Sequence, residues 1–147
     1  MELNTASAAI GFAKALEEDS AKFYEDLSRR YPQNEEVFLS LAKENRKNAA
    51  QVQRVYYEVI TDAIEGCFAF SMNPDEYTLK TELAKETGYT EALEKAVEIE
   101  DRTINFYMDA AEQSKSLLAD VPRAFTMIAR KREQRLPVLK SFAGKGA

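Results

Sequence analysis

Two glutamates and two tyrosines recur at the same spacing in the two halves of the sequence. Glu17 stands seven residues before Tyr24, and Glu100 stands seven residues before Tyr107. Seven residues make about two turns of an α-helix, so each Glu–Tyr pair is expected on one face of a helix. Carboxylates brought together inside a protein either ligate a metal ion or pair with buried cations.

Two further pairs of polar residues interrupt apolar stripes elsewhere. Asn45 and Asn48 lie three residues apart, as do Arg132 and Arg135. Projection in steps of three and four places apolar residues at the ends of each stripe and polar residues at its middle. Six polar side chains are therefore predicted to meet at the centre of the molecule: Glu17, Asn45, Asn48, Glu100, Arg132 and Arg135.

Four long helices must position these side chains. We expect them over about residues 5–31, 32–65, 90–115 and 120–143, with Asn4 or Thr5 capping the first. The breaks are predicted at Pro32 and Gly66, and Pro137 should kink the last helix. Residues 66–89 form a long crossover with a short helix over 81–87.

The two halves of the chain resemble each other. Phe23-Tyr24 recurs as Phe106-Tyr107, and Leu41-Ala42 matches Ile128-Ala129. Two related helical hairpins joined by one long crossover make an all-α four-helix bundle. Residues 1–147 are expected to form one domain, which suits a chain of 147 residues.

Composition excludes several classes of function. The chain has no histidine and a single cysteine, Cys67, which excludes His-dependent catalysis and, within one chain, paired-cysteine metal sites and a disulfide framework. A net charge of −5 argues against a nucleic-acid or anionic-membrane binder. No apolar run is long enough to span a membrane, and the N-terminal residues do not resemble a signal peptide, so we expect a cytoplasmic protein. Cys67 is interpreted as a small buried apolar residue.

The Glu–Tyr spacing, followed each time by a Leu-Ala or Ile-Ala helix, resembles the rubrerythrin branch of the ferritin-like superfamily over nearly the whole chain. That resemblance implies a ferritin-like bundle with a di-iron centre held by one Glu from each of two helices and a Glu-x-x-His from each of the other two. Glu17 and Glu100 match the first kind of ligand. Tyr24 and Tyr107 match the tyrosines that the family places beside the site.

The Glu-x-x-His positions depart from the family pattern. Asn45 and Asn48 occupy one of them, and Arg132 and Arg135 occupy the other. The sequence also lacks the paired-cysteine domain that delivers electrons in full-length rubrerythrins. Two carboxylates and two guanidinium groups sum to zero charge without a metal, and Arg pairs with carboxylates in a planar, bidentate way. We therefore expect a Glu/Arg/Asn network with the two tyrosines at the former metal site, and no cofactor.

Three functions from different classes remain open. The first is a non-catalytic bundle that serves as a structural or interaction module. The second is a rubrerythrin-type oxidoreductase that binds iron or manganese through Glu17, Glu100 and a third carboxylate at Glu44. The third is binding of a small anion in the bundle core. Periodicity turns Glu44 about 100° away from Asn45, so it is expected to face solvent, and Arg135 could also extend outward along its aliphatic stem.

The crossover has an apolar character that could form a subunit interface. Phe68, Phe70, Met72 and Tyr77 lie in it. They either pack across the chain's own helices or meet a second copy, since an uncovered apolar strip needs a partner. A homodimer is expected on the second interpretation, and the protein partner is not identified.

Overall fold

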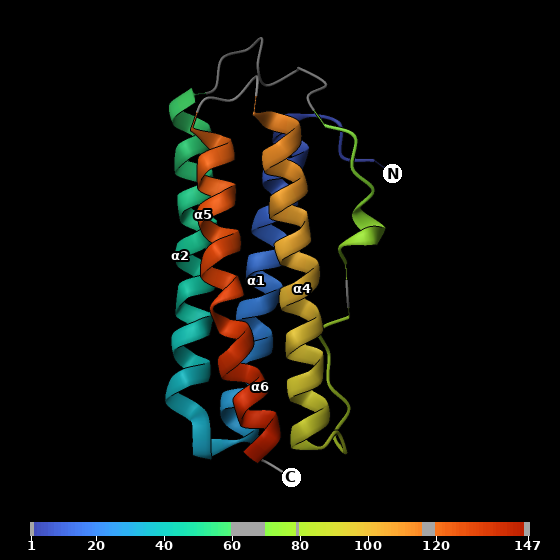
Figure 1. The fold of residues 1–147 in the computed structure, drawn as a ribbon, viewed down its shortest axis with the longest axis vertical. Coiled ribbons are helices and arrows are strands. Elements are labelled where there is room, and N and C mark those ends of the chain that lie inside the picture. Colours follow the sequence, from blue (N-terminus) through green and yellow to red (C-terminus); the bar gives the residue numbers. More distant parts are fainter. Residues whose placement is uncertain (1, 60–69, 79, 116–119, 146–147) are drawn as a thin grey trace.

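The computed structural model describes residues 2–59, 70–78, 80–115 and 120–145. Over these residues the chain is all-helical, apart from one isolated bridge between Leu3 and Met72. The long helices are α1 (Ala6–Arg30), α2 (Glu35–Val59), α4 (Tyr89–Ser114), α5 (Val121–Glu133) and α6 (Arg135–Lys145), and the short 3₁₀ helices are η1 (Pro32–Asn34) and η2 (Pro74–Glu76). In the described part of the chain, α5 and α6 follow one another as the fourth member of a four-helix bundle (Figure 1).

The helices form two antiparallel hairpins that lie side by side. α1 packs mainly on α2, and α4 packs on α5 and α6. Following the colours in Figure 1, α2 and α4 run in the same direction, and residues 70–78 and 80–88 pass along the outside of α4. The expected all-α four-helix bundle is therefore confirmed for the described part of the chain.

Local signals explain where the helices begin and end. Thr5 Oγ1 accepts a hydrogen bond of 3.1 Å from the Ala8 amide and caps α1, and Pro32 follows its end. Pro137 has no N–H for the carbonyl of Glu133, and its ring crowds that carbonyl. The fourth helix is accordingly interrupted at Gln134, between α5 and α6. The expected stop at Gly66 lies outside the described residues.

The short helix predicted over residues 81–87 is wrong. Its described residues form an irregular stretch with a turn at Lys85 and Glu86. The carbonyls of Leu83 and Ala84 accept hydrogen bonds from the Arg30 guanidinium at 2.9 and 2.7 Å. Those carbonyls accept hydrogen bonds from a side chain of α1 and not from the backbone amides of a helix. The segment is therefore held against the bundle without forming a helix.

The crossover covers the bundle with its own apolar residues. Phe70, Met72 and Tyr77 are buried in one core cluster. Leu3 and Met72 exchange backbone hydrogen bonds of 2.7 and 3.3 Å, and the Tyr77 hydroxyl donates to Asp109 at 2.6 Å. These three crossover residues therefore pack against the chain's own helices and supply no exposed strip for a partner. Phe68 and Cys67 lie outside the described residues.

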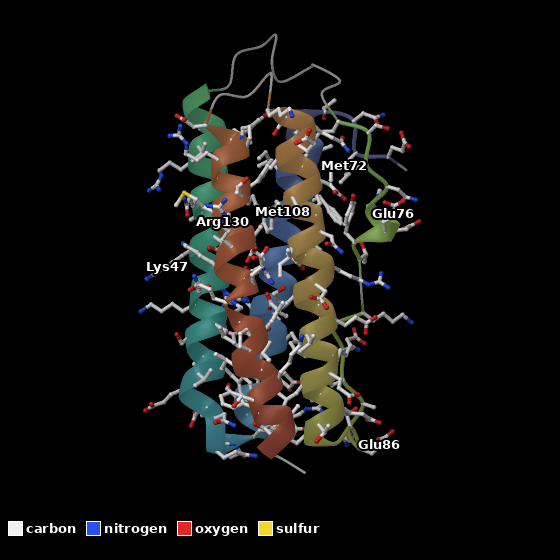
Figure 2. The ribbon with its side chains drawn as sticks, in the orientation of Figure 1. Lys47, Met72, Glu76, Glu86, Met108 and Arg130 are labelled. Carbon is white, nitrogen blue, oxygen red and sulfur yellow. The ribbon has the colours of Figure 1, made fainter. Side chains whose placement is uncertain are left out.

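The core consists of two apolar clusters separated by a polar layer. One cluster contains Ile10, Val52 and Phe125, and the other contains Leu27 and Leu93. Along every helix the polar residues predicted to point inward fall between members of the two clusters. The bundle therefore holds a buried polar layer across its middle, where the side chains shown in Figure 2 fill the space between the helices.

Candidate functional site

All eight residues expected at the centre are buried in the polar layer. Relative exposure is 4% for Arg135 and 0% for the other seven, which are Glu17, Tyr24, Asn45, Asn48, Glu100, Tyr107 and Arg132. They come from α1, α2, α4, α5 and α6, so every helix of the bundle contributes. Arg135 therefore points inward and does not extend to solvent.

Arg132 lies at the centre of the layer and contacts both glutamates. Its Nε and Nη2 donate to the two carboxylate oxygens of Glu17 at 3.2 and 2.9 Å. Its Nη1 donates to Glu100 Oε1 at 2.6 Å. The Nη2 atom is also 3.2 Å from the hydroxyl of Ser20. A single guanidinium thus joins the two carboxylates, with bidentate geometry toward one of them.

Arg135 extends the network toward the outside of the bundle. Its Nη1 donates to Glu100 Oε2 at 3.2 Å and to Asn45 Oδ1 at 2.8 Å. Its Nη2 donates to Glu44 Oε1 at 2.9 Å. The guanidinium also lies 5.7 Å from the centre of the Tyr24 ring, within the range of a cation–π contact.

Each tyrosine binds the glutamate of the other half of the chain. The Tyr24 hydroxyl donates to Glu100 Oε2 at 2.5 Å, and the Tyr107 hydroxyl donates to Glu17 Oε2 at 2.6 Å. The contacts are reciprocal, since α1 supplies a tyrosine to the glutamate of α4 and receives one in return. Burial, and then the neighbouring carboxylate, raise the pKa of both tyrosines well above the ordinary value. Both phenols are therefore neutral donors at physiological pH.

The charges of the layer compensate one another. Burial alone would raise the pKa of Glu100, but Arg132 and Arg135 outweigh it and hold that pKa below the ordinary value. Burial would lower the pKa of Arg132 and Arg135, yet the glutamates raise the pKa of both. Glu100, Arg132 and Arg135 are thus held in their charged forms, and such pairing of opposite charges is what makes buried charge tolerable.

Sequence reasoning missed two members of the network. Glu44, expected to face solvent, has a side chain that is 39% exposed and pairs with Arg135. An arginine is long enough to reach a carboxylate at the rim of the bundle, and helical periodicity alone does not reveal such a contact. Ser20 lies three residues after Glu17 on the inward face of α1. This spacing could have predicted that Ser20 contacts Arg132.

Three buried polar atoms of the described layer have no hydrogen-bond partner. They are Asn45 Nδ2, Asn48 Oδ1 and Arg135 Nε. Asn48 contributes only one contact, from its Nδ2 to Glu17 Oε1 at 3.4 Å. The two asparagines therefore use less of their hydrogen-bonding capacity than the arginines do. Each unpaired buried group costs on the order of 1–3 kcal/mol of folding free energy.

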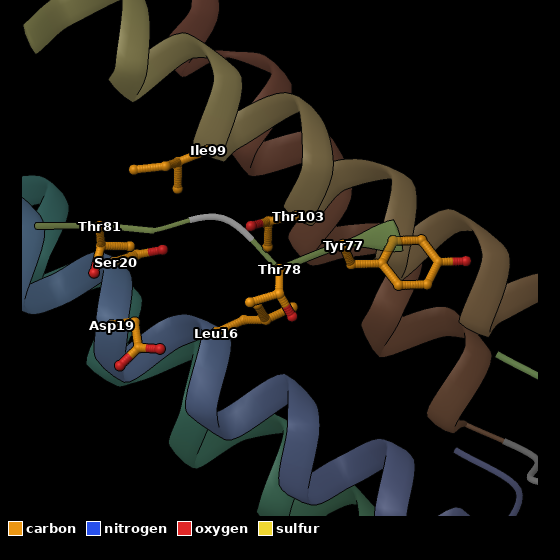
Figure 3. A pocket seen from close by; sticks show the side chains of 8 residues that line it. All are labelled: Leu16, Asp19, Ser20, Tyr77, Thr78, Thr81, Ile99 and Thr103. Carbon is orange, nitrogen blue, oxygen red and sulfur yellow. The ribbon is translucent and has the colours of Figure 1, made fainter. Parts of the chain in front are cut away.

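A small cavity reaches the layer from one side of the bundle. Figure 3 shows its lining side chains, with Ser20 on α1, Thr103 on α4, and Tyr77, Thr78 and Thr81 on the crossover. Its volume is about 20 Å³, which is room for about one water molecule. The opening beside Ser20 is therefore far smaller than an organic substrate needs.

The donor set does not fit a di-iron centre. Both oxygens of Glu17 and both oxygens of Glu100 already accept hydrogen bonds from arginine or tyrosine. Among the described residues, no group of three or more His, Cys, Asp or Glu is placed to hold a metal ion. A cation entering the layer would also meet two guanidinium groups, which repel it.

Comparison with family models, curated proteins and solved structures finds no match to this chain. Within the part of the chain that the structure describes, no helix combines the length and apolar character that a membrane crossing requires.

Proposed function

We propose that the protein is a non-catalytic bundle of the rubrerythrin-like, ferritin-like type that acts as a structural or interaction module. A network of Glu, Arg and Asn replaces the di-iron ligands. One observation carries the proposal: Arg132 contacts both Glu17 and Glu100 directly at 2.6–3.2 Å, in the place where a metal would have to lie.

The architecture supports this assignment. A single long crossover between two antiparallel hairpins is typical of ferritin-like bundles. The reciprocal contacts of Tyr24 and Tyr107 agree with a chain built from two related halves. The family and the cytoplasmic location rest on the sequence resemblance and on composition, and a homodimer stays a prediction.

The oxidoreductase alternative requires the network to open. A metal ion would have to displace Arg132 from both glutamates and then tolerate two nearby cations. Among the described residues, Glu44 is a further carboxylate in contact with the network, and its Oε1 is already bound to Arg135. A metal ion that took both glutamates would leave the Arg132 guanidinium buried without a carboxylate, which disfavours this reaction centre by several kcal/mol.

Small-anion binding is the second candidate, and one observation favours it. Asn45 Nδ2 and Arg135 Nε are buried donors without an acceptor in the described residues. An anion would nevertheless add a negative charge to a network in which three glutamates already contact two arginines. The small volume of the cavity beside Ser20 further limits what could enter.

Metal analysis of protein purified without chelator, followed by anaerobic titration with ferrous iron, tests the proposal. We expect less than about one tenth of an equivalent of iron, manganese or zinc, because the carboxylate oxygens are occupied. Tight binding of one or two equivalents would overturn the proposal in favour of the oxidoreductase. Titration calorimetry with sulfate and phosphate separates the second candidate, and binding that is lost in Asn45→Ala would favour it.

A further inference from the structure

A groove runs along the outside of the α4–α5 hairpin, away from the polar layer. It has a volume of about 380 Å³, and nine side chains line it: Met108, Ala111, Glu112, Lys115, Pro122, Arg123, Thr126, Met127 and Arg130. Met108 and Arg130 lie at a similar level of the bundle in Figure 2. No contact described so far uses this groove.

The lining residues form two parallel stripes. From Met108 on α4 to Lys115, which directly follows α4, the spacing is i, i+3, i+4, i+7, and on α5 the spacing from Arg123 to Arg130 is the same. Residues at this spacing share one face of a helix. Because α4 and α5 are antiparallel neighbours, the two stripes make the walls of a straight groove about two helical turns long, or about 10 Å.

Two exposed methionines lie in the groove, Met127 on α5 near its middle and Met108 on α4 at the level of Arg130. Met108 and Met127 are each 45% exposed. Methionine side chains are flexible and polarizable, and they occur at surfaces that accommodate the apolar side chains of partner helices. Two exposed methionines facing one groove therefore favour the docking of an apolar ridge.

The ends of the groove are basic, although the chain as a whole is acidic. Arg123 and Lys115 lie at one end, where Arg123 pairs with Asp120 at 3.6 Å, and Arg130 lies two turns away, with Glu112 as an acidic lining residue. Glu112 pairs with Lys115 at 2.8 Å, and both side chains are at least 66% exposed. In the described residues Arg130 has no ion pair within 4.0 Å. Solvated pairs of this kind exchange partners at little cost.

The charge pattern identifies the class of occupant. A symmetric dimer with its axis through the groove would bring the arginines of the two copies together, and like charges in an interface disfavour association. A helix with apolar residues flanked by carboxylates two turns apart would match both the methionines and the basic ends.

We propose that this groove binds an acidic amphipathic helix of a partner protein, with its apolar ridge on Met108 and Met127 and its carboxylates on Arg123 and Arg130. This inference deepens the interaction role within the proposed function. It depends on the outer face of the hairpin and not on the state of the polar layer.

Binding of a synthetic helix tests the inference directly. The probe is an 18-residue stapled peptide on an Ala/Gln background with Glu, Leu, Leu and Glu at i, i+3, i+4 and i+7. Its counterpart carries Lys in place of both Glu. Fluorescence anisotropy with the full-length protein should give a Kd below about 100 µM for the acidic peptide and at least tenfold weaker binding for the basic one.

Charge reversal provides the decisive variant. The double variant Arg123→Glu/Arg130→Glu should weaken the acidic peptide at least tenfold and reverse the preference toward the basic peptide. Lys47→Glu, an exposed change on α2, and the charge-matched double variant Lys43→Glu/Lys47→Glu should leave binding unchanged. Met127→Asn should weaken binding about tenfold, whereas Val138→Asn, at a side chain 42% exposed on α6, should not.

Several outcomes would overturn the inference. These are a Kd above about 1 mM for the acidic peptide, equal binding to the charge-reversed variant, and a concentration-dependent dimer that the charge reversal abolishes in sedimentation experiments. The last result would identify a second copy as the occupant. Iron binding by the wild type would overturn the proposed function and leave the peptide result intact, so the two failures are distinguishable.

Discussion

Arg132 and Glu17 share two parallel hydrogen bonds across the bundle, from Nε and Nη2 to the two carboxylate oxygens, at 3.2 and 2.9 Å. Both side chains are completely buried, and they belong to different hairpins. A bidentate pair fixes orientation as well as distance. The contact therefore sets the register of α5 against α1 at the level of the polar layer.

Removing this guanidinium should cost far more than removing an exposed one. Arg132→Ala leaves Glu17 and Glu100 buried with reduced compensation, and we expect a loss of about 3–5 kcal/mol in the free energy of unfolding. The matched control is Arg46→Ala, which breaks solvated pairs with Glu18 and Glu25 and should cost about 1 kcal/mol or less. Urea denaturation measures both, and a loss below about 0.5 kcal/mol for Arg132→Ala would contradict a buried pair.

The tyrosine hydroxyls should each contribute a smaller amount. Tyr24→Phe removes one donor from Glu100, which keeps Arg132 and Arg135, so we expect a loss of about 1–2 kcal/mol. Tyr107→Phe should behave alike because the contacts are reciprocal. Tyr57→Phe, at a side chain 63% exposed, serves as the control in thermal unfolding, and equal effects at all three sites would rule out a special role for the buried hydroxyls.

Stability should depend on pH at both ends of the scale. The folded-state pKa of Glu100 lies below its ordinary value of 4.5, so its contribution is present above that value and is lost as pH falls through the lowered pKa. The folded-state pKa values of Tyr24 and Tyr107 lie above 10.0, so their contributions are present below that value and are lost as pH rises through the raised pKa values. Denaturation midpoints from pH 2 to 12 measure both limbs.

The variant Glu100→Gln distinguishes the loss of stability caused by protonation of Glu100 from the loss caused by protonation of other carboxylates. This variant should be less stable at neutral pH, because Arg132 loses a carboxylate, and its stability should fall less steeply below about pH 4.5. If the free energy of unfolding of the variant fell as steeply at low pH as that of the wild type, the loss of stability would come from other carboxylates.

Restoring the family's ligands should restore metal binding if the registers are aligned correctly. The quadruple variant Asn45→Glu/Asn48→His/Arg132→Glu/Arg135→His would hold four carboxylates, which balance the charge of about two divalent ions. We expect it to bind ferrous iron or manganese in anaerobic titration. The control Asn45→Glu/Asn48→His retains both arginines and should bind none, and a folded quadruple variant without metal affinity would refute the alignment.

Helical periodicity was sufficient to predict most of the fold and most of the residues of the polar layer. Glu17, Glu100, Asn45 and Arg132 lie at matching heights on apolar stripes, and the structure buries all of them. Helical periodicity predicts the direction in which a side chain points but not how far a long side chain extends. The pairing of Glu44 with Arg135 was missed for this reason. The irregular conformation of residues 80–88 depends on the tertiary contact with Arg30, and local sequence cannot reveal it.

The exchange of tyrosines between the halves makes the two hairpins mutually dependent. Alone, the α1–α2 hairpin would bury Glu17 without Tyr107 or Arg132, and the α4–α5–α6 hairpin would bury Glu100 without Tyr24. Neither half can satisfy its own carboxylate fully, so the polar layer couples the folding of the two halves. If the chain were divided within the crossover, the fragments should be largely unfolded apart and should fold by complementing each other, as a heterodimer made from one gene.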